Sequence, residues 1–327
     1  MDKSWQVVFI YLLTHLGLIF FLYPANIIGS SDESHWIPVL VGVLLHICIV
    51  YLYLKGLAFF PGKDIIEIYT QGGQLLKVLF LLPIFAYFMM AMIISVRAYS
   101  EIITIVFLSN TPLWAIMLLL LVITCYMAIK GVEAIFRTGM VIAYLFLPLI
   151  IFVIFFSFQN VDWNYLYPVW NSDFSFLKKQ NFLNSFFAIG GGFLFLGFVQ
   201  PYFSYKKNMV FWGIALVVPC FFLSVYVPIL TYGQATASTF FFPFVMTLDA
   251  INITWLMFDR VTIFFLLSLI TFIMLFLSLV MWKAVRIAHS FIPIVKPSYL
   301  ALVFTLSIFL ICLDRKSTRL NSSHLLI

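Results

Sequence analysis

Long apolar runs with few charged residues inside them constrain this chain more than any other feature. Nine are found: Trp5–Ile28, Trp36–Leu54, Val78–Ile105, Leu113–Ile129, Gly139–Phe158, Phe182–Val199, Met209–Leu230, Val261–Trp282 and Tyr299–Leu313. Each comes near the ~20 residues that an α-helix needs to cross the hydrocarbon core of a bilayer. The runs are continuously apolar rather than alternating, which favours helices over the strands of a barrel. We therefore predict an all-α integral membrane protein.

The composition excludes several other classes of protein. Of the 327 residues, 64% are hydrophobic and 9% are charged, whereas about a quarter are charged in soluble domains. The 18 basic residues are spread over short loops without a basic stripe, so lipid rather than nucleic acid is the expected partner. The four cysteines lie inside apolar runs without CxxC spacing, which favours buried thiols over a metal or redox site. We find no catalytic motif and expect no enzyme, metal or cofactor.

The loops indicate the orientation in the membrane. With the N-terminus inside, eleven basic residues fall on the inner side and four on the outer side. This bias places the N-terminus in the cytoplasm. The inner segment Asp64–Leu76 alternates apolar and polar residues, with Asp64 and Glu67 at capping-box spacing. We expect an interfacial helix there, at about residues 64–76, on the cytoplasmic face.

The end of the chain differs in character from the rest. Residues 314–327 read DRKSTRLNSSHLLI, a string similar to the read-through of a sequencing adaptor. We expect a non-native tail that follows a single transmembrane domain of residues 1–313, with a tenth helix lost by truncation. The alternative is a genuine polar tail.

Two of the nine runs contain helix-breaking residues. The first carries Gly17 near its centre, with Pro24 seven residues later, and the sixth carries the triplet Gly190–Gly192, with Pro201 after it. Glycine loosens a helix and proline removes a donor, so both runs are candidates for local unwinding. Unwound backbone at that depth is tolerated only where protein or a cavity satisfies the freed polar groups.

The positions of the two breaks, five spans apart, predict a binding site. Transporters with five-plus-five inverted repeats bind their substrate between two such discontinuous helices near the midplane of the membrane. Freed carbonyls there attract an ammonium and freed N–H groups attract a carboxylate, so a small zwitterion such as an amino acid fits. The predicted ligand-binding residues are Thr14, His15, Gly17, Leu18, Gly190, Gly191, Gly192 and Phe193.

Each of these signals has a plainer alternative. Gly17 can serve close helix packing, and His15 can bond to the carbonyl of a neighbouring helix. No aspartate, glutamate or lysine lies in the middle of any predicted span, so the usual proton relay of a symporter is missing. Ser268 and Thr271 are candidates for a sodium site, although such hydroxyls often bond back to their own helix.

Two pairs of opposite charges occur at i,i+4 spacing. Arg97 and Glu101 lie near the outer end of the third span, and Glu133 and Arg137 lie at the cytoplasmic edge of the fifth. Mutual pairing on one helix face is the simpler interpretation of both. A gating role is the alternative.

An ordered set of short motifs resembles a known family. The set comprises Gly17, Pro24 and Trp36; Phe60-Pro61 and Ile68-Tyr69; Arg97; Thr111-Pro112; Tyr126; Lys130–Arg137; Asp162-Trp163; Leu166–Val169; and Asp259-Arg260. Together these elements run over residues 5 to 313. The chain resembles the B subunit of bacterial spore germinant receptors, the spore-germination permeases of the amino acid-polyamine-organocation superfamily.

The resemblance implies ten helices in the inverted-repeat arrangement and nutrient sensing in the inner membrane of a dormant spore. It also implies two partners, an A-type membrane subunit and a C-type lipoprotein. The nutrient itself is not implied, because the side chains that select it vary. An ion-coupled amino-acid symporter of the same superfamily is the competing hypothesis, and a structural scaffold is a third.

Overall fold

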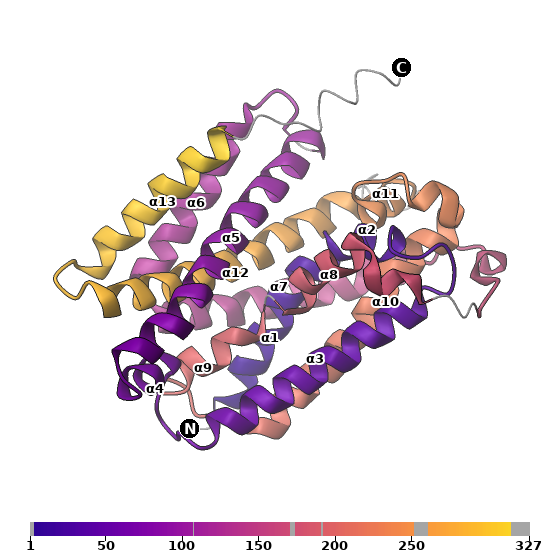
Figure 1. The fold of residues 1–327 in the computed structure, drawn as a ribbon. Coiled ribbons are helices and arrows are strands. Elements are labelled where there is room, and N and C mark those ends of the chain that lie inside the picture. Colours follow the sequence, from indigo (N-terminus) through magenta and orange to yellow (C-terminus); the bar gives the residue numbers. More distant parts are fainter. Residues whose placement is uncertain (1–2, 107, 171–173, 191, 252–260, 315–327) are drawn as a thin grey trace. The chain divides into compact units, whose positions relative to one another are not determined.

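The computed structural model describes residues 3–106, 108–170, 174–190, 192–251 and 261–314. All regular elements in these ranges are helical, as predicted (Figure 1). In chain order they are α1 (Ser4–Ile19), α2 (Tyr23–Ile28), α3 (Trp36–Leu57), α4 (Ile65–Gln71), α5 (Gln74–Val106), α6 (Leu113–Lys130), α7 (Val132–Phe156), η1 (Trp163–Leu166), η2 (Ser175–Lys178), α8 (Gln180–Gly190), η3 (Phe193–Phe195), α9 (Leu196–Val199), α10 (Lys207–Ala237), α11 (Pro243–Asp249), α12 (Val261–Phe291) and α13 (Pro297–Asp314).

The described residues contain seven helical stretches that are long and apolar enough to cross a membrane. They are Trp36–Leu57, Gln74–Val106, Leu113–Lys130, Val132–Phe156, Gln180–Val199, Lys207–Ala237 and Thr262–Phe291. Two shorter apolar helices, Ser4–Ile19 and Pro297–Leu313, correspond to the first and ninth predicted runs. Each run read from the sequence is therefore mainly helical where it is described, and the first and sixth runs are interrupted by turns.

Several boundaries differ from those expected. The segment expected as one interfacial helix at 64–76 is divided, because Gly73 has a φ of 104° and separates α4 from α5. Glycine adopts this backbone conformation without the steric penalty of a side chain. Helix α12 continues past Trp282 to Phe291, and α11, which begins at Pro243, was not predicted.

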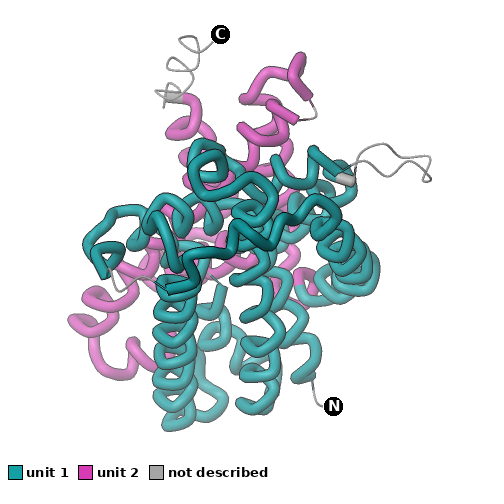
Figure 2. Tube along the Cα trace, turned by 90° about the vertical axis from the view of Figure 1, so that its right-hand side faces the viewer, with its two compact units in different colours: residues 1–64, 136–276 teal, residues 65–135, 277–327 magenta. Residues whose placement is uncertain are grey.

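The chain divides into two compact units (Figure 2). Unit 1 comprises residues 1–64 and 136–276, and unit 2 comprises residues 65–135 and 277–327. The division falls inside α12, whose first part belongs to unit 1 and whose second part belongs to unit 2. Within unit 2, helices α5, α6 and α13 pack against one another, and α4 packs on α5 (Figure 1).

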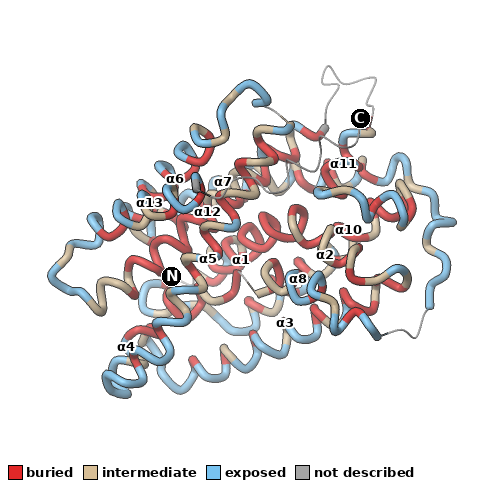
Figure 3. The backbone as a smooth tube through the Cα atoms, turned by 45° about the horizontal axis from the view of Figure 1, so that its top comes forward, coloured by how far each residue is buried: buried red, intermediate tan, exposed pale blue. Residues whose placement is uncertain are grey.

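Unit 1 is organised around α1, which is buried over most of its length (Figure 3). Helix α1 packs along α10, while α2 and α3 both contact α8 and α10. Gly17 makes one of the close approaches in this unit. A Cβ atom built on Gly17 would lie 3.2 Å from the backbone nitrogen of Ile273 and 3.3 Å from the carbonyl carbon of Phe272. Gly17 therefore serves helix packing against α12.

The loop between α2 and α3 is fixed by hydrogen bonds inside unit 1. Ser34 Oγ and Trp36 Nε1 both donate to the Val169 carbonyl, at 3.1 Å and 2.9 Å. Gln234 Nε2 on α10 donates to the carbonyls of Ile28 and Ser31, at 3.1 Å and 3.0 Å. These bonds hold the end of α2 and the following loop in one position.

We expect Gly17→Ala to lower the thermal stability of the purified protein in detergent. Its Cβ would press on backbone atoms, and overpacking of this kind costs about 1–3 kcal/mol. The matched control is Gly56→Ala on α3, where a Cβ meets nothing within 4 Å. The control removes a helical glycine at no steric cost and should leave the melting temperature unchanged or raised. Equal melting temperatures for the two variants would contradict the packing role.

Candidate functional site

The first break lies between Gly17 and Pro24, inside the stretch that was predicted. Helix α1 runs through Gly17 and ends at Ile19, and α2 begins at Tyr23 with Pro24 in its first turn. Between them the N–H groups of Phe21 and Leu22 donate to the Leu18 carbonyl at 3.4 Å and 3.3 Å. These hydrogen bonds are long, and the position of the turn follows from the proline, which is favoured at the start of a helix. Gly17 itself remains helical.

The second break coincides with the glycine triplet. Helix α8 ends at Gly190, and the chain resumes as the 3₁₀ turn η3 at Phe193 before α9 begins. The predicted site residue Gly191 lies outside the described residues. The last four carbonyls of a helix have no partner within the helix itself, so the end of α8 places potential hydrogen-bond acceptors inside unit 1.

Gly192 brings the two broken segments together. A Cβ atom built on Gly192 would touch the ring of His15, with Nδ1 at 2.6 Å and Nε2 at 2.9 Å, and with Cε1 closer still. The His15 ring on α1 therefore occupies the space that any larger residue at 192 would need. In contrast, a Cβ at Gly190 would meet nothing within 4 Å.

His15 belongs to a buried aromatic cluster. Its Nδ1 donates to the Tyr11 carbonyl at 2.7 Å, and the Tyr11 hydroxyl is hydrogen-bonded to His46 Nε2 on α3. The Tyr11 and His15 ring centroids are 4.1 Å apart, and those of His15 and His46 are 5.3 Å apart. Phe193 approaches His46 edge-on at 5.9 Å. All four side chains are buried.

Two nitrogens of this cluster, His15 Nε2 and His46 Nδ1, have no hydrogen-bond partner among the described residues. The carbonyl of Ile189 interacts electrostatically with His15, but not in the geometry of a hydrogen bond. Because a carbonyl only accepts, His15 Nδ1 carries the ring proton and Nε2 presents a lone pair. A buried acceptor without a partner costs about 1–3 kcal/mol, so this position favours a ligand that can donate.

The remaining predicted binding residues have other contacts. Thr14 donates its hydroxyl to the carbonyls of Ile10 and Tyr11 in its own helix, at 2.8 Å and 3.1 Å. Leu18 is buried and supplies the carbonyl of the loose turn. Gly17 packs against α12, and Thr14 and Leu18 have the contacts given above. Of the predicted binding residues, His15, Gly192 and Phe193 therefore remain as the candidates for one site.

Sequence reasoning did not propose Tyr11, His46 or Tyr53 for this region. Tyr53 donates its hydroxyl to the Leu194 carbonyl at 3.0 Å, and its ring lies 5.5 Å from that of Phe193. The spacing of Tyr11 and His15, one helical turn apart on one face, was the available signal. No local signal in the sequence links α3 to the glycine triplet.

The candidate ion-site hydroxyls bond within their own helix. Ser268 Oγ donates to the Phe264 carbonyl at 2.8 Å, and Thr271 Oγ1 donates to the Ser268 carbonyl at 2.7 Å. Their protons are therefore used inside α12, as intrahelical back-bonding predicts. Only oxygen lone pairs remain for an ion.

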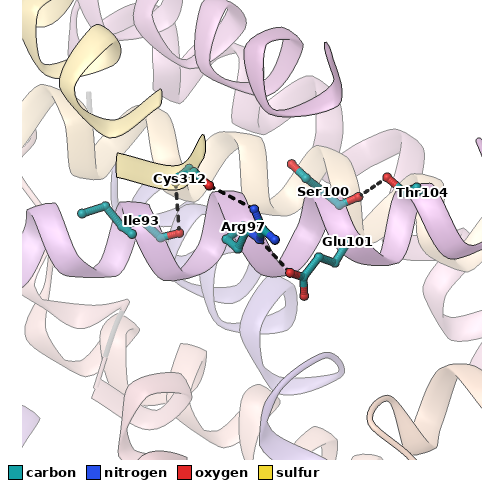
Figure 4. A network of polar contacts seen from close by, with 6 residues as sticks. All are labelled: Ile93, Arg97, Ser100, Glu101, Thr104 and Cys312. Carbon is teal, nitrogen blue, oxygen red and sulfur yellow. Dashed lines mark hydrogen bonds and ion pairs between the residues drawn. The ribbon is translucent and has the colours of Figure 1, made fainter. Parts of the chain in front are cut away.

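Arg97 and Glu101 form an ion pair inside unit 2, with 2.7 Å between Nε and Oε1. Figure 4 shows that Arg97 also reaches α13, where its Nη1 donates to the Cys312 carbonyl at 3.0 Å. The second predicted pair, Glu133 and Arg137, lies near the start of α7. The Asp259-Arg260 motif lies outside the described residues.

Lys283 corrects one inference from the sequence. Because α12 continues to Phe291, this lysine lies inside a candidate span, near its C-terminal end, and not in the loop after Trp282 as predicted. The side chain is 1% exposed, and its Nζ lies 4.1 Å from the centre of the Phe88 ring on α5. A cation over an aromatic face is stabilised by roughly 0.5–2 kcal/mol, which offsets only part of the loss of hydration.

We expect Gly192→Ala and Gly190→Ala to behave differently. The added methyl at 192 must displace the His15 ring, which should lower stability in detergent by about 1–3 kcal/mol. The same methyl at 190 enters open space and should change little. Thermal denaturation of the two variants measures the difference, and a loss at 190 that matched the loss at 192 would contradict the described contact.

We expect Lys283→Met to leave stability unchanged or raised. Replacing a buried charge by an apolar residue of similar length is often neutral or stabilising, because the loss of hydration is avoided. The control is Lys296→Met, an exposed lysine in the loop before α13, which should have no effect. A clear loss of melting temperature for Lys283→Met alone would show that the ammonium itself is needed for the fold.

Comparison with known proteins agrees with this architecture. The family model described as spore germination protein matches residues 3–319. Spore germination protein B2 of Bacillus subtilis (strain 168) is 24% identical over 265 residues, which cover 78% of this chain and 70% of that protein. The spore germination protein YfkT of the same strain is 23% identical over 233 residues, which cover 71% of this chain and only 64% of that relative. The chain belongs to the spore germination protein family.

Proposed function

We propose that this chain is the nutrient-sensing membrane subunit of a spore germinant receptor. The supporting observation is the contact of His15 with Gly192, which joins the broken helices α1/α2 and α8/α9 beside a buried acceptor nitrogen. Family membership supports a role in germination. The ligand site and the sensing mechanism are our inference from the geometry.

The chemistry of this region favours a ligand that donates hydrogen bonds. His15 Nε2 offers a lone pair, and we infer that the final carbonyls of α8 can offer further acceptors. An ammonium group satisfies both kinds of acceptor, and charge-assisted hydrogen bonds are about twice as strong as neutral ones. We therefore propose an amino acid as the nutrient, with its amino group toward His15. Of the predicted set, His15, Gly192 and Phe193 are the residues on which this proposal depends.

We also propose the five-plus-five inverted repeat within a single transmembrane domain of residues 1–313. The division of the chain supports it in part, because three of the four described pairs of spans five apart belong to the same unit: the first and sixth, the second and seventh, and the fourth and ninth. The remaining pair does not follow this pattern, since the third span belongs to unit 2 and most of the eighth belongs to unit 1. Repeat-related segments are expected to have equivalent structural roles.

Nutrient binding would act by shifting a conformational equilibrium. A ligand that fits the closed arrangement of α1 and α8 better than the open one increases the population of the closed state. Differential affinity of about 5.5 kcal/mol is enough to reverse a 99:1 ratio. We propose that an A-type membrane subunit and a C-type lipoprotein read this shift in the spore inner membrane, with the N-terminus of this chain in the cytoplasm.

The alternative is an ion-coupled amino-acid symporter, and one observation favours it. Lys283 is a buried ionisable group inside a membrane helix, the kind of residue that marks an ion or proton pathway. Proteoliposomes with the purified protein distinguish the two functions. Uptake of labelled amino acid that depends on an imposed ion gradient would favour the symporter, whereas saturable binding without uptake would favour the sensor.

We expect His15→Phe to abolish the response of the protein to its nutrient while the fold is retained. The measurement is the ligand-induced thermal shift of the purified protein against a panel of amino acids and sugars. Loss of one charge-assisted hydrogen bond, about 1.5–3 kcal/mol, should weaken binding at least tenfold. The matched control is His289→Phe in unit 2, where the ring bonds to the Val295 carbonyl. Equal ligand shifts in the two variants would contradict the proposed site.

A further inference from the structure

A pocket of about 300 Å³ lies in unit 1, away from the His15 cluster. One wall is formed by the end of α3 and the loop after it, and the other by the segment between α9 and α10. The lining residues are Leu54, Leu57, Ala58, Pro61, Gly62, Gln200, Phe203, Ser204, Tyr205 and Lys207.

Hydrogen bonds and ring contacts fix the walls of this pocket. Gln200 Nε2 donates to the Phe60 carbonyl at 2.9 Å, which ties one wall to the other. The Tyr205 hydroxyl donates to the Leu196 carbonyl at 3.0 Å. The Phe203 ring is stacked on that of Phe136, with centroids 4.1 Å apart. The pocket is therefore formed without a ligand.

The interior of the pocket is apolar and its mouth is cationic. Leu54, Leu57 and Phe203 are buried, while Ser204 and Lys207 are exposed. Lys3 Nζ lies 4.7 Å above the Phe203 ring, which adds a second positive charge beside the pocket. None of the described lining residues is an aspartate or a glutamate, so an anion entering the mouth would meet no repulsion from the lining.

The surroundings indicate that the anion belongs to a lipid. Phe59, which directly follows the lining residue Ala58, is 74% exposed, and aromatic residues of this kind prefer the interface between lipid and water. The acyl chains of such a lipid would remain in the surrounding bilayer while its headgroup lies at the mouth of the pocket.

The lysines place this end of unit 1 on the cytoplasmic side under the positive-inside rule. The cytoplasmic leaflet carries the anionic lipids, and lysines near its surface attract them. We propose that the pocket is a binding site for the headgroup of one anionic phospholipid, with the phosphate at Ser204 and Lys207. The proposal does not depend on nutrient sensing.

The test is a titration of the purified full-length protein in detergent, with binding followed by native mass spectrometry. The probes are dioctanoyl phosphatidylglycerol, dioctanoyl phosphatidylcholine and inorganic phosphate. We expect phosphatidylglycerol to bind about tenfold more tightly than phosphatidylcholine. Lys207→Gln should remove this preference, whereas Lys178→Gln, an exposed lysine outside the pocket, should preserve it.

Ala58→Trp provides an independent variant, because it fills the pocket without changing the charge. We expect it to weaken binding of phosphatidylglycerol by at least tenfold, and size-exclusion chromatography checks that each variant remains folded. Equal affinity for the two lipids, or the same result for Lys207→Gln and Lys178→Gln, would overturn the proposal. Inorganic phosphate that binds as tightly as phosphatidylglycerol would also overturn it, since the pocket would then recognise free phosphate.

Discussion

The structure depends on one constraint: polar backbone groups within a lipid bilayer must find partners inside the protein or in a ligand. Most of the described chain meets this constraint with continuous helices, but α1/α2 and α8/α9 do not. The loose turn after α1 keeps weak bonds to the Leu18 carbonyl. The chain after α8 lies against a histidine whose second ring nitrogen has no described partner. This buried acceptor determines the kind of ligand that we propose.

The helical fold could be predicted from the sequence, because span length and apolar composition are local properties that the membrane enforces. The break at the glycine triplet was also predictable, since consecutive glycines cannot support a stable helix. Close packing at Gly17 was one of two predicted roles, but its partner Ile273 could not be predicted, because it approaches from a distant segment. The same holds for His46, which reaches the site only through the packing of α3. Lys283 was misplaced because the end of α12 could not be read from hydropathy alone.

The described contacts also separate two roles that small residues have in this protein. Gly17 allows two helices to approach, and any side chain there would press on backbone. Gly192 instead makes room for the ring of His15. A larger residue at 192 would therefore affect function by displacing this imidazole. The pocket beside Lys207 is a third feature, formed by the end of α3 and by loops rather than by a helix break. Nutrient and lipid would therefore act on different parts of unit 1.

Nitrogen NMR of protein labelled with ¹⁵N-histidine tests the central claim most directly. In the free protein, His15 Nε2 should give the signal of an unprotonated ring nitrogen without a hydrogen bond, assigned by comparison with His15→Phe. Saturating nutrient should shift this signal toward that of a hydrogen-bonded nitrogen and leave the signals of His289 unchanged. A His15 signal that does not move when nutrient is bound would contradict the account, because the ligand would then bind elsewhere.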